Sequence, residues 1–499
     1  MTHARNCECD YCKNQKPFDM PKHLAEKLAS SELVVFAGAG ISTENKTNAK
    51  NTFYEEIHDE LDLKDATPTF PELMSQFCAQ PDGRIKLIER IKQRFDNFSS
   101  FDQFYNRMSQ FHRALAPLFM ITDVVTTNWD DFFERECGFT PFVYDSDLAF
   151  WDASPRRVMK IHGSITNFGS IVATNEDYQL SYERLNDGPL GAHLKSLIAR
   201  KTVAYVGYSL SDENYLRLLG NIARMMGDKT RQSYFISPQI DADRIRAAPV
   251  PLIPIETDGA FFFEEVRRTN GDALGITAES AFYCCLKLLD EVATIHDKTA
   301  TAFLKTNHPL LIFALSYQDG LSHALRRIIR MKKTGEYHSI NSVHSRVHTY
   351  AGMAQDYIKH ENFWDAAYCL GYHNGLLYLL LASQSQKAPN PPFFEMPFDV
   401  TVGSLKEIAK RPRDKLPRKV VKFLREMMRD FPKKRWRCTG PPSLSLIARR
   451  ADQRSVIRHS LVNVRRRVTA SPSPPYQLPA SRQGASPHRH HRAFPGDPA

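Results

Sequence analysis

Four short segments of the chain place residues suited to nucleotide chemistry directly after an apolar run. The first is ELVVFAGAGIST, residues 32–43, in which Gly38, Ala39 and Gly40 lead to Ile41 and Ser42. Glycines let the backbone turn tightly and approach a pyrophosphate, whose charge is met by amide groups at the start of the next helix. Because Thr43 stands where the full dinucleotide fingerprint has a third glycine, this segment alone fits a plain strand-to-helix turn equally well.

The other three segments repeat this arrangement and carry amide, carboxylate, imidazole or hydroxyl groups. They are DVVTTNWDDFFE (123–134) with Thr127, Asn128 and Asp130, RVMKIHGSI (157–165) with His162, and TVAYVGYSLSDENY (202–215) with Gly207, Ser209 and Asp212. Taken singly, the polar residues also fit helix caps or a structural histidine. Ligands of open parallel sheets bind at the carboxyl ends of the strands, so the four segments together predict one crevice.

The elements that position these residues form an α/β pattern. Apolar runs predict buried strands over residues 33–37, 123–126, 157–161, 202–206, 233–236 and 251–255. Helical periodicity near residues 69–94 and 101–115 predicts a small helical insertion between the first two strands. The expected fold is a Rossmann-like parallel sheet with a helical insertion, followed by an all-α carboxyl-terminal domain.

The domain organisation predicted from these patterns has four parts: an amino-terminal extension (1–19), a nucleotide-binding catalytic domain (20–290), a helical domain (291–434) and a disordered Arg/Pro-rich tail (435–499). Lys disappears from residue 435 onward, and Pro-Ser pairs multiply. This change fits either a genuine Arg-rich tail or an out-of-frame reading of GC-rich coding sequence. Reading the other two frames of the nucleotide sequence would separate these two hypotheses.

Charge and cysteine usage narrow the class of protein. The tail, with twelve Arg and two acids, carries the whole net charge of +10, so residues 1–434 are neutral and we do not expect a nucleic-acid partner. No apolar run approaches a membrane span and no secretion signal opens the chain, which predicts a cytoplasmic location. The nine cysteines are expected to be reduced, and Cys7, Cys9 and Cys12 are not expected to hold a metal.

The motifs GAGIS, TTNWD, KIHGS and VGYSLSD resemble, in order, those of the sirtuin family over about residues 20–260. The resemblance implies that residues 38–42 hold the phosphates of NAD and that Asn128 and Asp130 lie around the nicotinamide ribose. It also implies that His162 is the catalytic histidine and that Gly207 and Ser209 hold the adenosine half. We further expect Thr127 and Asp212 to contact the dinucleotide.

The chain departs from protein-deacylating sirtuins in two places. Between Asn128 and Asp212 it has only Cys137, so the four-thiolate zinc site of the deacylases cannot be assembled there. STENKTNAKNTFYEEI replaces the deacylase Gly-Ile-Pro-Asp-Phe-Arg segment. These departures, the opening CECDYCKNQKPF and the helical region resemble sirtuin-like effectors of bacterial antiphage defence, which implies NAD hydrolysis that depletes NAD. The helical region of that group supports assembly or senses a phage component, which implies a homo-oligomer and a phage trigger or partner defence protein.

Cleavage of NAD between ribose and nicotinamide passes through an oxocarbenium-like centre. We expect Asn128 to position water and the nicotinamide amide, Asp130 to orient the ribose, and His162 to act as a base. The catalytic pair is thus Asn128 and His162, NAD is the substrate and no metal is expected. Two other functions remain open: an NAD-dependent protein deacylase and a non-catalytic nucleotide-sensing module.

Overall fold

The computed structural model describes residues 10–46, 48–63, 66–306, 308–398, 402–412 and 416–429. It divides into two compact units, residues 1–412 and 413–499. The second unit is described over residues 416–429, which include helix α19 (Arg418–Arg429). The predictions for residues 1–9 and for the tail from 435 lie outside the described residues.

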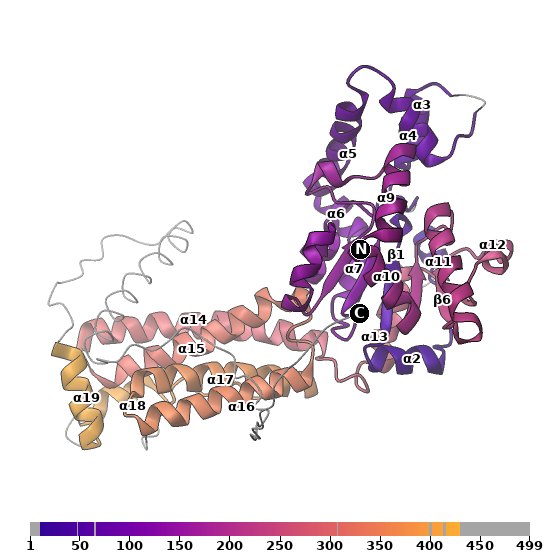
Figure 1. The fold of residues 1–499 in the computed structure, drawn as a ribbon. Helices are drawn as coiled ribbons and strands as arrows, with labels where there is room; N and C mark the ends of the chain where they lie inside the picture. The colour runs from indigo at the N-terminus through magenta and orange to yellow at the C-terminus, as the bar shows by residue number, and fades with distance from the viewer. Residues whose placement is uncertain are drawn as a thin grey trace, which may run out of the picture. The chain divides into compact units, whose positions relative to one another are not determined.

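The first unit is built on a seven-stranded parallel sheet (Figure 1) with the strand order β3-β4-β2-β1-β5-β6-β7. The strands are β1 (Leu33–Ala37), β2 (Asp123–Thr126), β3 (Thr140–Phe142), β4 (Arg157–Lys160), β5 (Thr202–Val206), β6 (Ser233–Ser237) and β7 (Leu252–Glu256). All six predicted strands are confirmed to within one residue at each end. The sequence did not predict β3, a three-residue edge strand that contains a proline and buries only Phe142.

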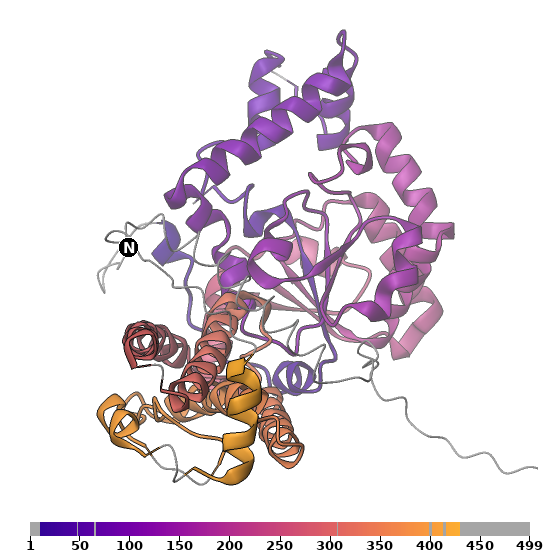
Figure 2. The same ribbon diagram turned by 90° about the vertical axis from the view of Figure 1, so that its left-hand side faces the viewer.

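Helices cover both faces of the sheet (Figures 1 and 2), because alternate residues of each buried strand point to opposite sides. Val34 and Phe36 of β1 join one apolar cluster, whereas Leu33, Val35 and Ala37 join another. The first cluster is completed by α10 (Pro189–Arg200) and α11 (Glu213–Met226), and the second by α2 (Lys22–Ala29), α7 (Gln110–Leu115) and α13 (Gly259–Asn270).

The insertion between β1 and β2 forms a helical subdomain with its own apolar core, as the sequence predicts. That core joins α3 (Phe53–Glu60), α4 (Phe70–Cys78) and α5 (Gly83–Ser100) to Ile171 and Ala173, which follow β4. Helix α6 (Asp102–Met108) then leads to α7. The remaining elements of the sheet region are short or peripheral: α1 (Asp10–Lys13), η1 (Ala39–Ile41), α8 (Phe132–Cys137), η2 (Asp145–Ala153), η3 (Phe168–Ser170), α9 (Asn175–Asp187), η4 (Gly227–Lys229) and α12 (Ala242–Ala247).

The carboxyl-terminal part of the first unit is helical, which confirms the predicted fold class. Its long helices run alongside one another (Figure 1): α14 (Glu279–Thr306), α15 (Leu310–Arg330), α16 (Ile340–Lys359) and α17 (Phe363–Gln384), with the shorter η5 (Lys332–Thr334) and α18 (Leu405–Lys410). The predicted domain boundary after residue 290 falls inside α14, which runs unbroken across it. None of the helices in the described ranges is long and apolar enough to cross a membrane.

Candidate active site

The four predicted motifs follow four neighbouring strands at one edge of the sheet. In the order β4-β2-β1-β5, these strands end just before His162, Asn128, Gly38 and Gly207, respectively. All their pairings are parallel, so their carboxyl ends share one edge. The structure therefore places the expected glycine, amide and imidazole residues along a single rim, as the strand-end argument predicts.

The glycine loop after β1 interlocks with Gly207 after β5. The amide of Gly38 donates to the carbonyl of Val206 at 3.0 Å, and the amide of Gly40 donates to the carbonyl of Gly207 at 3.0 Å. A Cβ atom at Gly38 would lie 2.5 Å from the carbonyl oxygen of Gly207, closer than real Cβ atoms approach. Gly207 itself has φ +58°, and a Cβ atom there would lie 2.6 Å from the amide nitrogen of Ile41. Glycine is thus required on both sides of this contact.

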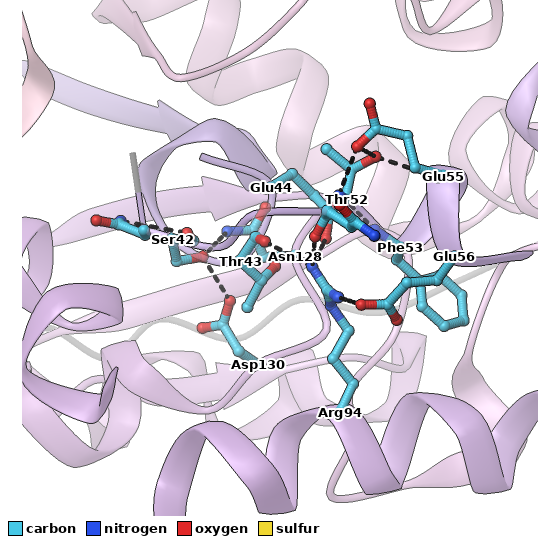
Figure 3. Close-up of polar contacts among 12 residues, drawn as sticks. Ser42, Thr43, Glu44, Thr52, Phe53, Glu55, Glu56, Arg94, Asn128 and Asp130 are labelled. Atoms are coloured by element: carbon cyan, nitrogen blue, oxygen red, sulfur yellow. Dashed lines mark hydrogen bonds and ion pairs between the residues drawn. The ribbon is translucent and has the colours of Figure 1, made fainter. Parts of the chain in front are cut away.

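A buried polar cluster lies at this edge of the sheet and consists of Ser42, Asn128 and Asp130 (Figure 3). The hydroxyl of Ser42 donates to Oδ2 of Asp130 at 3.1 Å, and Nδ2 of Asn128 donates to Oγ of Ser42 at 3.4 Å. Among the described residues, Oδ1 of Asn128 is buried and has no hydrogen-bond partner. A buried acceptor without a donor is costly, so this oxygen is a candidate ligand contact.

The pKa of Asp130 is affected by burial and by a lysine that the sequence analysis did not single out. Burial raises the pKa of Asp130, and the positive charge of Lys160 opposes this rise. The fully buried Lys160, at the end of β4, donates to the backbone carbonyl of Asp130 and pairs with Glu134 at 3.0 Å. Lys160 therefore fixes the backbone between β2 and α8. The sequence did contain a signal for this role, since a lysine in an otherwise apolar strand indicates a buried charge that needs partners.

The polar loop after Ser42 is held by Arg94 of α5 (Figure 3), which the sequence analysis also missed. Nη2 of this buried arginine donates to the carbonyls of Thr43 and Asn51, each at 2.9 Å. Arg94 also pairs with Glu44 at 3.4 Å and with Glu56. The helical subdomain thus holds in place the loop after Ser42, the segment that stands where deacylases have their Gly-Ile-Pro-Asp-Phe-Arg motif. Two of these four partners of Arg94 are backbone carbonyls, which leave no signal in the sequence.

His162 and Asp212 meet across the rim. Nε2 of His162 lies 3.1 Å from Oδ2 of Asp212, and both side chains are largely buried. Thr127 is half-buried beside Asn128, and its amide lies 3.4 Å from the carbonyl of Ala37. Ser209 is exposed, and its carbonyl accepts a hydrogen bond from Arg244. The structure therefore does not bring Ser209 into the buried cluster, and its part in nucleotide binding stays a prediction.

A cavity of about 30 Å³ lies beside the glycine loop. Gly40, Ile41 and Gly207 line it together with residues after β6 and β7, including Pro238 and Asp258, which the sequence analysis did not include. Pro238 and Asp258 could have been predicted from the sequence, since they also follow strands that end at this edge of the sheet.

Within the part of the chain that the structure describes, no group of three or more His, Cys, Asp or Glu side chains could hold a metal ion. Cys7 and Cys9 lie outside that part.

Comparison with known proteins identifies the region around β2, β4 and β5. Residues 122–249 match the family model of the SIR2-like domain. The chain contains a SIR2-like domain. This finding confirms the sirtuin resemblance of the motifs that follow β2, β4 and β5, which lie within the matched residues. The glycine loop at residues 38–42 precedes the matched segment of the SIR2-like domain and joins it through the contact with Gly207.

Curated relatives of this SIR2-like domain include NAD(+) hydrolases and a defence protein. The NAD(+) hydrolase ThsA of Cytobacillus dafuensis is 26% identical over 253 residues, which cover 50% of this chain and 48% of the relative. Defense-associated sirtuin 2 of Bacillus subtilis is 26% identical over 234 residues, covering 43% and 22%. The NAD(+) hydrolase ThsA of Enterococcus faecium is 26% identical over 226 residues, covering 44% and 46%. The chain thus spans about half or less of the length of these relatives.

Proposed function

We propose that the SIR2-like domain hydrolyses NAD at the bond between nicotinamide and ribose, giving nicotinamide and ADP-ribose. The observation that carries this proposal is that Oδ1 of Asn128 is buried and faces no donor among the described residues. The other polar atom of the Asn128 side chain, Nδ2, donates to Ser42, and Ser42 in turn donates to Asp130. A water molecule, a ribose hydroxyl or the amide of nicotinamide would supply the missing donor. The names of the relatives from Cytobacillus dafuensis and Enterococcus faecium support the same reaction.

In this mechanism the chain holds the sugar and manages a proton rather than supplying a nucleophile. The glycine loop, residues 38–42, receives the phosphates, because glycine allows a ligand to approach the backbone closely, and Gly207 and Ser209 hold the adenosine half. Asn128 orients water and the nicotinamide amide, and Asp130 fixes Ser42 and the ribose region. His162 accepts a proton from a ribose hydroxyl or from the attacking water, a role typically worth about 100-fold to 10,000-fold in rate.

The biological setting is proposed on the same basis. The catalytic domain precedes α14, and the helical domain that begins with α14 supports assembly of a homo-oligomer or senses a phage component. Depletion of NAD then serves antiphage defence in the cytoplasm, in line with the names of the relatives.

The decisive experiment measures nicotinamide released from NAD by the purified chain, with and without an acylated peptide and with and without phage lysate. A hydrolase releases nicotinamide without the peptide, whereas a deacylase requires it. Asn128→Ala and His162→Ala should each lower release at least about 100-fold while circular dichroism stays unchanged. Matched controls are Asn186→Ala and His360→Ala, at exposed positions in α9 and just after α16, which should keep wild-type activity.

Two results would overturn the proposal. One is a folded wild-type chain that releases no nicotinamide under any of these conditions, which would favour a nucleotide-sensing module. The other is full activity in folded Asn128→Ala protein.

A further inference from the structure

The contact between His162 and Asp212 spans an unusual distance in the sheet. Strands β4 and β5, which precede these two residues, are separated by β2 and β1. Neighbouring strands lie about 4.8 Å apart, so the two strand ends are roughly 14 Å apart. Nevertheless Nε2 of His162 lies 3.1 Å from Oδ2 of Asp212. The segment between β5 and α11 must therefore cross the rim to deliver the carboxylate.

The backbone between β5 and α11 contains two residues with positive φ that change its direction. Gly207 has φ +58° and Leu210 has φ +51°, so two left-handed residues turn the chain within four positions. A left-handed conformation is unfavourable for a leucine and persists only where the surroundings enforce it. Leu210 is buried in the apolar cluster with Tyr208 and Tyr215, which supplies that enforcement.

Asp212 divides its two carboxylate oxygens between two tasks. Oδ1 accepts the backbone amide of Tyr215 at 3.1 Å and caps the amino terminus of α11, whereas Oδ2 lies at the distance of an ion pair from Nε2 of His162 without the alignment of a hydrogen bond. Burial acts to raise the pKa of Asp212, but the neighbouring His162, with the amides of Tyr215 and Asn214, outweighs it and lowers the pKa. The carboxylate is therefore ionised at neutral pH. Capping alone would not require a charge, since asparagine and serine cap helices as well.

The imidazole of His162 is held from other directions too. The ring of Tyr178 packs on it, with centroids 5.0 Å apart and planes inclined at 60°. The carbonyl of His162 accepts the amide of Val172 at 3.0 Å, which fixes the backbone. A carboxylate beside Nε2 favours the tautomer that carries its proton there, so Nδ1 keeps the lone pair that a base needs.

We propose that Asp212 is a positioning residue for His162: it fixes the ring in the tautomer protonated at Nε2 and stabilises the imidazolium that forms during the reaction. The proton leaves a ribose hydroxyl or the attacking water and binds Nδ1, while Nε2 keeps its own proton beside the carboxylate of Asp212. This role rests on the proposed NAD hydrolysis and differs from a direct contact between Asp212 and the dinucleotide.

Asp212→Asn is the test variant, because asparagine retains the helix cap but cannot accept the Nε2 proton as a carboxylate does. With NAD as substrate, kcat should fall about 100-fold while KM changes less than about threefold. Asp228→Asn is the matched control for the loss of a carboxylate, since the side chain of Asp228 is exposed and the variant should leave both constants unchanged. A raised KM with unchanged kcat would instead indicate contact with NAD and overturn the inference, as would wild-type kcat in Asp212→Asn.

Two further measurements distinguish positioning from a merely structural role. If Asp212 acts through His162, adding Asp212→Asn to His162→Ala should lower the residual rate no further. Nitrogen chemical shifts of the His162 ring should report the Nε2-protonated tautomer in wild-type protein and a mixture of tautomers in Asp212→Asn.

The failures of the two proposals are distinguishable. A wild-type chain that cleaves no NAD contradicts the proposed function, but its ring shifts still test the tautomer assignment. A wild-type chain that cleaves NAD, with an Asp212→Asn variant of equal kcat, contradicts the positioning role alone.

Discussion

Replacing Gly207 with alanine tests whether the interlocked glycines set the geometry of the site. The new Cβ atom would lie 2.6 Å from the amide nitrogen of Ile41, 2.7 Å from Cγ2 of Ile41 and 2.8 Å from the carbonyl carbon of Gly40. Two of these three atoms are backbone atoms of the glycine loop. To reach an ordinary contact of about 3.4 Å, the loop must move by about 0.8 Å.

The magnitude has two parts. A left-handed conformation costs alanine about 1 to 2 kcal/mol. Forcing extra volume into a packed site typically costs a further 1 to 3 kcal/mol, roughly. The displaced loop carries Ser42, whose hydrogen bonds to Asp130 and from Asn128 measure 3.1 and 3.4 Å and cannot survive a shift of that size unchanged. Misplacement of a reacting group by about 1 Å can lower a rate about 100-fold.

The assay combines nicotinamide release from NAD with urea unfolding of the same preparation. Gly275→Ala is the matched control, because Gly275 has φ +63° but a Cβ atom there meets nothing within 4 Å. The control should lose only the conformational cost, about 1 to 2 kcal/mol, and keep its activity. If Gly207→Ala matched Gly275→Ala in both stability and rate, the steric argument for the interlocked loops would be refuted.

Three further variants test two residues of the site region and one buried arginine at the opposite end of β4. Arg94→Ala should lower the free energy of unfolding by about 3 kcal/mol and reduce nicotinamide release, because it leaves two loop carbonyls and the half-buried Glu44 without this partner. Urea unfolding and the NAD assay measure these two effects. Asp130→Asn should remove a pH dependence of the free energy of unfolding. Burial raises the folded-state pKa of Asp130 above its ordinary 3.8, so the wild-type chain loses stability relative to the variant as pH rises from below 4 through that raised pKa. Urea unfolding of both proteins at several pH values measures this loss. Arg156→Met should cost about 3 kcal/mol in thermal unfolding, because this buried guanidinium donates to the carbonyls of Ala116, Cys137 and Thr334.

Each of these variants has a contradicting result. For Arg94, it is a stability equal to that of exposed Arg90→Ala on the same helix. For Asp130, it is a constant stability difference between the two proteins across the pH range. For Arg156, it is a melting temperature equal to that of Arg246→Met, which replaces an exposed arginine of α12.

The sequence by itself determined the central strands and the order of the motifs. The apolar runs 33–37, 123–126 and 202–206 coincide with β1, β2 and β5, because a parallel strand covered by helices on both faces must be apolar along its whole length. The edge strand β3 lacks this requirement and was missed. The same logic placed Gly38, Asn128, His162 and Gly207 on one rim, since chain direction alone decides which strand ends coincide.

Only the tertiary structure decided how these groups engage one another. Arg94 and Lys160 hold the site through backbone carbonyls distant in sequence, and a carbonyl is present at every residue, so no residue pattern marks it. The contact of His162 with Asp212 depends on a loop that crosses two intervening strands. Local sequence determines which groups stand at the strand ends. The packing of distant segments determines which oxygen each group meets, and for His162 it places Nε2 beside the carboxylate of Asp212.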